Sequence, residues 1–159
     1  MTGTVRVNLY DQYTFDAIPF QTVKIKGVTF YTDGNGVVTV TDIADGAATW
    51  ETLPIGYGNN SGSVTVVADE TVTKSVYADP DDAYLGGVVR DGTTPLHGAT
   101  LTSYGFSAST MVSGIYYKIH PTGTYNILCK ATGYVDQIKS VTIWGGDDIT
   151  SLDFAMVAV

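Results

Sequence analysis

The amino-acid sequence predicts an all-β protein. Val, Thr, Tyr and Ile alternate with polar residues over short stretches, which include TVRVNLY (4–10), VVTVTDI (37–43) and SVTIW (140–144). Segments with the 3.6-residue period and the capping residues of helices are hard to find. Turn sequences such as TDGNGV, RDGTTP and WGGDD separate the alternating stretches. These three observations indicate short strands joined by tight turns.

Composition limits the classes of function. The chain has 159 residues, of which 44% are hydrophobic, enough to bury one ordinary core or two small ones. Its net charge of −8 disfavours binding to nucleic acid or anionic lipid. The single cysteine, Cys129, excludes an intrachain disulfide, a thiolate metal cluster and a CxxC redox pair. Stability must therefore come from packing.

The first fifteen residues, MTGTVRVNLYDQYTF, lack the apolar core of a secretory signal. No run approaches the roughly 18 apolar residues that a membrane-spanning helix needs. If Met1 is the true start, we expect a protein that is made in the cytosol and does not leave by the general secretory route.

In the first half of the chain, TDGNGV (32–37) lies between two strand-like runs. Gly34, Asn35 and Gly36 can adopt positive φ, so the sequence predicts a tight hairpin here. The next strand, within GAATWETLPIGY (46–57), contains Pro54, and Thr52 stands at an inward position. Because proline removes a ladder donor, this strand is either a sheet edge or ends its pairing early.

In the second half, the stretch GTYNILCKATGY (123–134) alternates through its whole length. The alternation sends Tyr125, Ile127, Cys129 and Ala131 to one face, where a sandwich core can bury them. Gly133 then permits a sharp exit, and Tyr134 can cover the core edge with its hydroxyl hydrated or bonded.

The two dodecapeptides belong to an internal repeat. Adding 77 to the positions of Gly46 and Gly56-Tyr57 gives Gly123 and Gly133-Tyr134, and the offset continues from VTV (64–66) to VTI (141–143). Upstream, AIPFQTVKIKG corresponds to TTPLHGATLTSYG. The sequence therefore predicts two related domains, 1–79 and 84–159, joined by a short acidic linker at 80–83 that Pro80 stiffens.

These motifs resemble the carboxypeptidase regulatory-like domain, a transthyretin-like β-sandwich related to the collagen-adhesin B-type repeats. The second unit carries the resemblance as GGVVRDGTTPLHGATLT, SGIYYKI and GTYNILCKATGY, and the first as TDGNGVVTV and GAATWETLPIGY. The resemblance implies two tandem Ig-like, transthyretin-like β-sandwich domains. It specifies a fold and no activity.

Candidate chemical groups are few. His97 and His120 are the only histidines, and without a converging carboxylate or an orienting partner we expect both to be exposed at strand ends. Cys129 lies at an inward position, where a thiol acts as a small hydrophobe. We therefore expect neither a metal site nor a nucleophile from these residues.

Two acidic turns have ligands that suit a hard cation. Asp33 and Asn35 lie in one, and Asp147 and Asp148 in the other, but the distant glutamate of an EF-hand is missing and turn formation explains the same residues. Asn59-Asn60-Ser61 is a glycosylation sequon, which matters only in a secreted chain.

Aromatic residues offer a binding surface. Eleven tyrosines with Trp50 and Trp144 could stack on sugar or form a protein interface, although sandwich packing accounts for most of them. No Ser-His-Asp series, phosphate-binding glycine loop or pair of catalytic carboxylates has usable spacing. The sequence therefore predicts a protein that is not an enzyme, with no catalytic residue, cofactor or metal.

Two functional classes follow. The first is a decorating or accessory subunit of a virus or phage particle, bound to capsid, tail or filament subunits, which the missing signal favours. The alternative is a cell-surface or extracellular module that recognises glycan or protein. In either class we expect binding through exposed loops or a free sheet edge, with candidates at 54–60 and 151–159.

Overall fold

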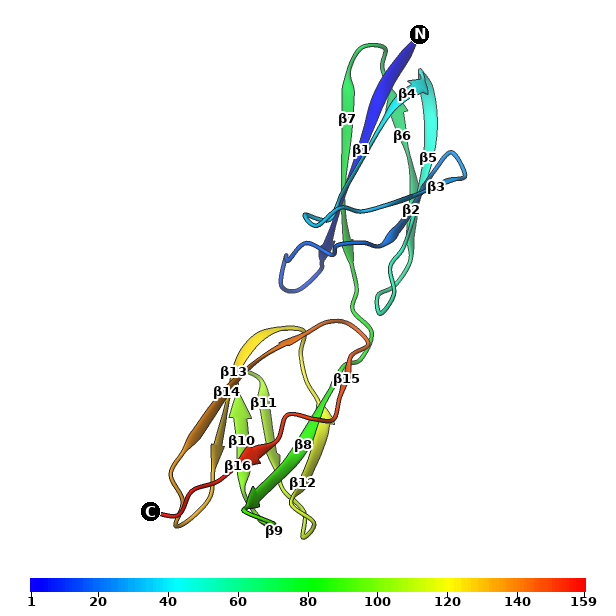
Figure 1. Cartoon of the computed structure of the whole chain (residues 1–159). Helices are drawn as coiled ribbons and strands as arrows, with labels where there is room; N and C mark the ends of the chain where they lie inside the picture. The colour runs from blue at the N-terminus through cyan, green and yellow to red at the C-terminus, as the bar shows by residue number, and fades with distance from the viewer. The chain divides into compact units, whose positions relative to one another are not determined.

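The computed structural model describes residues 1–159 as sixteen β-strands without a helix, which confirms the all-β prediction (Figure 1). The chain forms two compact units, Met1–Asp81 and Asp82–Val159. Each unit has its own hydrophobic core between two sheets. Each is described below by itself.

Unit 1 contains seven strands in two sheets. One sheet has the order β4-β1-β7 and the other β3-β2-β5-β6. The strands are β1 (Thr2–Asp11), β2 (Thr22–Ile25), β3 (Val28–Tyr31), β4 (Val37–Ala44), β5 (Gly46–Leu53), β6 (Asn60–Val66) and β7 (Thr71–Ala78).

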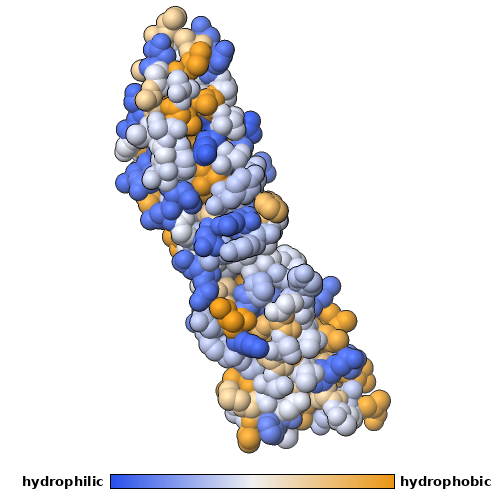
Figure 2. All heavy atoms as spheres, turned by 180° about the vertical axis from the view of Figure 1, so that it is seen from behind, coloured by the Kyte–Doolittle hydropathy of each residue, from blue (hydrophilic) through white to orange (hydrophobic).

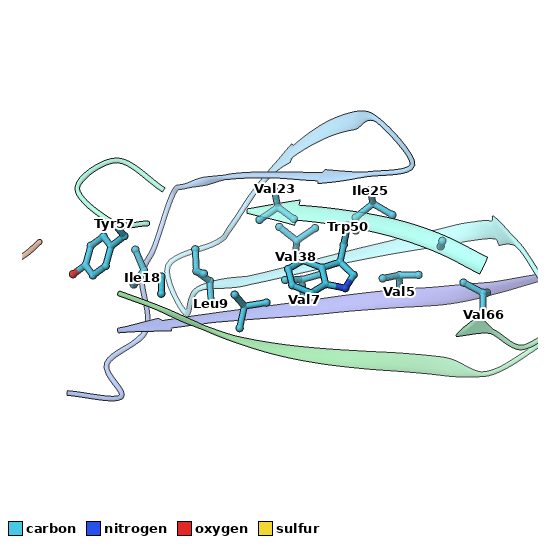
Figure 3. Close-up of a cluster of buried hydrophobic side chains, with 13 residues drawn as sticks. Val5, Val7, Leu9, Ile18, Val23, Ile25, Val38, Trp50, Tyr57 and Val66 are labelled. Atoms are coloured by element: carbon cyan, nitrogen blue, oxygen red, sulfur yellow. The ribbon is translucent and has the colours of Figure 1, made fainter. Parts of the chain in front are cut away.

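The core of unit 1 follows from the alternation of its strands. Val5, Val7 and Leu9 of β1 are fully buried, while the residues between them face outward. From the opposite sheet, β5 contributes Trp50, whose ring lies among the core valines (Figure 3). The apolar residues of the two sheets thus meet face to face, as in a β-sandwich.

The first and last strands of unit 1 pair in parallel. The register is continuous over eight positions, from Thr4 opposite Thr71 to Asp11 opposite Ala78. On the other side of β1, β4 pairs antiparallel, with a register shift between Gly3 and Val5. β1 is therefore the central strand of its sheet.

Unit 2 contains nine strands. β8 (Tyr84–Asp91) is central in one sheet, between β12 (Ile115–Ile119) and β15 (Asp148–Ile149), and it also pairs with β9 (Thr94–Pro95) and β16 (Phe154–Ala155). The second sheet has the order β11-β10-β13-β14, with β10 (Thr100–Ser103), β11 (Phe106–Ser109), β13 (Gly123–Lys130) and β14 (Gln137–Ile143).

The core of unit 2 confirms the predicted inward face of residues 123–131. Ile127 and Cys129 are fully buried, and Tyr125 and Ala131 pack against the same core cluster. Gly133 follows with φ of 87°, a conformation that favours glycine and turns the chain away from the sheet.

A tyrosine closes the end of each sandwich. Tyr57 donates from its hydroxyl to Asp11, the last residue of β1, at 3.2 Å. Tyr134 donates in the same way to Asp91, the last residue of β8, at 3.1 Å. The hydroxyl of Tyr134 is therefore bonded, one of the two states that the sequence allowed.

The parallel pairing that closes unit 2 is shorter than that in unit 1. β15 and β16 each pair with β8 over two residues, and the register shifts by one residue between them. Within the gap, Asp153 Oδ1 accepts the Val88 N–H at 2.8 Å. The Leu152 N–H also donates to the Gly86 carbonyl oxygen, at 3.1 Å. One side-chain contact thus forms part of a ladder that is continuous backbone in unit 1.

The structure corrects the expected hairpin at residues 32–37 and decides between the two alternatives for the strand before Pro54. Residues 32–37 form a turn but not a hairpin, because β3 pairs with β2 while β4 pairs with β1 in the other sheet. Of the three residues expected to adopt positive φ, only Gly36 does so, at 72°. The strand before Pro54 is not an edge, since β5 lies between β2 and β6, and it ends at Leu53.

Candidate interaction surfaces

Cys129 is a core residue, as predicted. Its side chain is fully buried on β13, opposite Leu101 of β10. Burial raises the pKa of its thiol to about 11, with a smaller contribution from Asp136. The thiolate that would act as a nucleophile or metal ligand is therefore scarce at neutral pH.

His120 is buried, so the prediction of an exposed histidine is wrong for this residue. Its Nδ1 lies 2.8 Å from the Pro121 carbonyl oxygen, and its Nε2 lies 2.8 Å from Ser103 Oγ. Since the carbonyl can only accept, Nδ1 carries the proton and Ser103 donates to Nε2. Phe106 and Tyr125 contact the ring with centroids at 4.5 and 4.6 Å.

This environment favours the neutral imidazole. Burial lowers the pKa of His120, and the hydrogen bond to Pro121 opposes this effect only in part. Ser103 and His120 have the separation of a nucleophile and its base, but the ring is 2% exposed and enclosed by aromatic side chains. The geometry supports a structural polar contact in the core.

The remaining predicted ligands do not converge. His97 is exposed in the segment between β9 and β10, as expected. No group of three or more His, Cys, Asp or Glu side chains is placed to hold a metal ion.

The acidic turns use their carboxylates on their own backbone. Asp33 Oδ1 accepts the N–H groups of Asn35 and Val37, and Asp147 Oδ2 accepts that of Trp144. Asp148 instead accepts the hydroxyl of Tyr117. Turn formation therefore accounts for Asp33 and Asp147, while Asp148 belongs to an aromatic cluster on unit 2.

The aromatic residues divide between core and surface. Trp50 is buried, so it cannot form part of a sugar platform, whereas Trp144 is 37% exposed. Exposed tyrosines are scattered over both units, and hydrophobic residues emerge between hydrophilic ones on the face in Figure 2. Two groups of rings in contact stand out. On unit 1, Tyr10 stacks on Tyr77, which Phe15 meets edge to face, and on unit 2, Tyr84 stacks on Tyr117.

The loop at 54–60 is only partly available for binding. Ile55 is 85% exposed, but Pro54 and Tyr57 are buried, and Tyr57 pairs with Pro80. Asn59 of the sequon is exposed in the same loop. Ile55 is thus the apolar contact that this loop offers to a partner.

The C-terminal segment belongs to its own sandwich. Phe154 and Met156 are buried, and the Met156 N–H donates to the Arg90 carbonyl oxygen at 2.7 Å. Beyond them, Ala158 forms a bridge with Tyr134. This segment, which the sequence analysis offered as a binding candidate, therefore pairs within its own unit.

The loop between β1 and β2 contains exposed aromatics that the sequence analysis did not single out. Phe15 and Phe20 have φ of 60° and 57°, unusual values for a bulky side chain, and both rings are exposed. Asp11 holds the start of the loop by accepting the N–H groups of Tyr13 and Thr14. Only the composition of DQYTFDAIPF (11–20) could have indicated this surface.

Comparison with known proteins identifies the fold alone. No family model and no curated protein matches the sequence. The structure is similar to the Bacillus anthracis TIE protein, with a TM-score of 0.51 and 18% identity over 98% of this chain and 34% of that one. The chain spans about a third of that protein's length.

Weaker likenesses concern pilins. The Streptococcal ancillary pilin gives a TM-score of 0.47 and 20% identity, over 100% of this chain and 63% of that one. Shaft pilin SpaA from Lactobacillus rhamnosus GG gives 0.42 and 12%, over 100% and 98%. No helix in the chain could cross a membrane. The TIE protein likeness, at low identity, establishes shared all-β architecture.

Proposed function

We propose that this protein is a non-enzymatic structural module of a cell-surface or extracellular assembly, in which it resists tension along its backbone. Two tandem domains, 1–79 and 84–159, would act in series through the linker at 80–83. The compact units Met1–Asp81 and Asp82–Val159 support this division. The 77-residue offset supports a common origin of both in the carboxypeptidase regulatory-like family.

The parallel ladder between β1 and β7 carries the proposal. Tension along the chain enters unit 1 at the start of β1 and leaves it at the end of β7, next to Asp11 and Ala78. Because the strands are parallel, this tension slides them past one another and loads all eight registered positions together. A hairpin pulled from its open end would instead lose its hydrogen bonds one at a time.

Unit 2 has the same direction of pairing but a weaker ladder. Its two short registers, at Asp148–Ile149 and Phe154–Ala155, are separated by the Asp153 side-chain contact. We therefore expect unit 2 to unfold at lower force than unit 1. This order gives the chain a sacrificial unit that extends first.

Force spectroscopy on the full chain between folded handle domains tests the tension role. We expect two unfolding steps, each releasing roughly 23 nm of chain, at clearly different forces. The Thr4 and Gln12 N–H groups donate to the carbonyl oxygens of Glu70 and Ala78, so the backbone groups of even-numbered residues in β7 point to β1. Lys74→Pro should thus lower the stronger step, because proline lacks the N–H that bonds to β1.

Thr73→Pro is the matched control, since its N–H points to the free edge of β7 and no ladder bond is lost. Lys74→Ala controls for the side chain, whose ammonium lies 5.6 Å from the Trp50 ring centroid. Equal forces for Lys74→Pro and Thr73→Pro would contradict the proposed role of the ladder.

Location requires a separate test. Antibody raised against the purified protein should label intact cells of the source organism. Labelling confined to purified virus particles would instead support the virion class. The virion class has no observation in the structure that favours it. Labelling only after permeabilisation of the cells would overturn the surface proposal.

A further inference from the structure

The outer face of β8 and β12 is apolar where an antiparallel sheet normally meets water with polar residues. Three residue pairs face each other across these strands: Ile115 with Val88, Tyr117 with Gly86, and Ile119 with Tyr84. None of the six residues is charged. The neighbouring positions on the same strands, such as Leu85, Val89 and Tyr116, already fill the core. Over these three residue pairs, the sheet is therefore apolar on both faces.

Large parts of these outward side chains remain in contact with water. Ile115 is 41% exposed, Tyr117 49% and Ile119 46%. Tyr84 stacks on Tyr117 with a centroid distance of 5.2 Å and an interplanar angle of 8°.

Gly86 allows Tyr117 to lie flat on this face. A Cβ atom at Gly86 would come within 2.7 Å of the Tyr117 ring and 2.8 Å of the Tyr116 carbonyl oxygen. The Tyr117 hydroxyl donates to Asp148 Oδ1 at 2.5 Å. The ring is thus held in one position, which lowers the entropy that a partner would have to remove on binding.

The corresponding sheet of unit 1 shows that the fold does not require an apolar outer face. There, β1 and β4 are likewise the central strand and its antiparallel neighbour. Their outward pairs include Arg6 with Thr39 and Asn8 with Val37. Both sheets close a core of similar kind, so the apolar face of unit 2 calls for a partner outside the unit.

The free edge of β12 is a poorer docking site than the face. The Ile115 carbonyl oxygen accepts the Met111 N–H, which removes one open acceptor. Lys118 reaches across to donate to the Ser107 carbonyl oxygen on β11, placing a cation beside the edge. Both features disfavour the addition of another strand.

Charges at the two ends of the face indicate its occupant. Arg90 lies at the end of β8 on the same side as Tyr84, Gly86 and Val88, and neither ion pair in the chain includes it. Asp148 lies beside Tyr84 at the opposite end. Two copies packed face to face with strands antiparallel would bring Arg90 of each near Asp148 of the other.

Unit 2 carries less net negative charge than unit 1, which favours contact between two copies through unit 2. Residues 82–159 contain six acidic and four basic side chains, a net charge of −2. Residues 1–81 contain ten acidic and four basic side chains, a net charge of −6. Copies that meet through unit 2 therefore repel each other less.

We propose that the outer face of β8 and β12 binds the same face of a second copy of this chain, antiparallel and two-fold symmetric, with Arg90 opposite Asp148. Two paired strands with about five residues each cover only a few hundred Å² per copy, well below the roughly 800 Å² of a standard interface. The contact is therefore weak, with a Kd of about 0.1–1 mM. A larger fraction of copies forms this contact where an assembly holds them side by side, because their local concentration is then high. The biological relevance of the contact therefore rests on the proposed assembly role.

Sedimentation of the full chain up to about 1 mM tests the contact without any force or localisation measurement. The wild type should form a reversible dimer, and Ile119→Lys should weaken it about tenfold or more by placing a charge in the apolar contact. Thr39→Lys on the outer face of unit 1 adds the same charge and should leave the dimer unchanged. A monomeric wild type, or equal effects of both variants, overturns the proposal.

Charge reversal tests the antiparallel register. Arg90→Asp alone and Asp148→Arg alone should each dissociate the dimer, because like charges then meet at both ends. A mixture of the two variants should restore association, since each copy supplies the charge that the other needs. Unfolding temperatures of each variant check that the chain stays folded. Failure of the mixture to associate, with both variants folded, overturns the antiparallel arrangement.

Discussion

Thr52→Val should stabilise unit 1. Thr52 lies on β5 with its side chain fully buried, and its Oγ1 has no hydrogen-bond partner. A hydroxyl buried in this way costs about 1–3 kcal/mol relative to a hydrated one. Valine has nearly the same shape and replaces the hydroxyl with a methyl group that belongs in the core. We expect the free energy of unfolding to rise by about 1–2 kcal/mol.

The magnitude can be measured in unit 1 alone because each unit has one tryptophan, Trp50 in the first and Trp144 in the second. In a Trp144→Phe background, fluorescence reports the unfolding of unit 1. For a unit of this size, a gain of 1–2 kcal/mol corresponds to a rise in Tm of roughly 5–15 °C.

Thr49→Val is the matched control, since Thr49 is exposed on the same strand and should change stability by less than about 0.5 kcal/mol. Thr52→Cys should also stabilise, because cysteine already occupies the position 77 residues later. If Thr52→Val lowers the Tm, the hydroxyl has a partner and the reasoning is wrong.

Three further predictions concern unit 2. Cys129→Ser should lower the free energy of unfolding by about 1–3 kcal/mol, because it buries a hydroxyl, and thiol reagents should label native Cys129 slowly; rapid labelling would contradict its burial. The lowered pKa of His120 means that the unfolded state binds more protons below about pH 6.5, so stability should fall as pH decreases from about 7 to 5. His120→Gln should remove this dependence and His97→Gln should not, as followed by urea unfolding; an unchanged slope in His120→Gln would exclude His120 as its source. Deleting residues 155–159 removes buried Met156 and the Tyr134 bridge, so Trp144 fluorescence should report loss of folding, and a stable truncated protein would show the segment to be dispensable.

The sequence predicts strands well where alternation and turn residues agree. For residues 123–134, the inward face, the glycine exit and the closing tyrosine all follow from spacing, and the structure places them accordingly. The turn at 32–37 shows the limit of such reasoning. Its local sequence specifies a tight turn, but which strands pair is set by the tertiary structure, and here the chain crosses between sheets.

Pairing between distant strands could not be predicted from the sequence, because the tertiary structure sets which strands pair. The parallel ladder between Thr4–Asp11 and Thr71–Ala78 joins residues 67 apart, and no local signal distinguishes it from an antiparallel pairing. The same holds for the Asp153 contact to Val88, where a side chain takes the place of a backbone carbonyl.

The wrong prediction that His120 is exposed and the apolar outer face of unit 2 have the same cause, which is the choice of inward-facing residues in and just after β12. The stretch IYYKIH (115–120) presents Ile115 and Ile119 at one parity and Tyr116, Lys118 and His120 at the other. Hydrophobicity alone would bury the isoleucines, yet the structure buries Tyr116 and His120. Core packing is satisfied without the isoleucines, so the stability of the unit does not explain why they are apolar. Binding of a second copy gives these exposed side chains a role that the fold of a single chain does not.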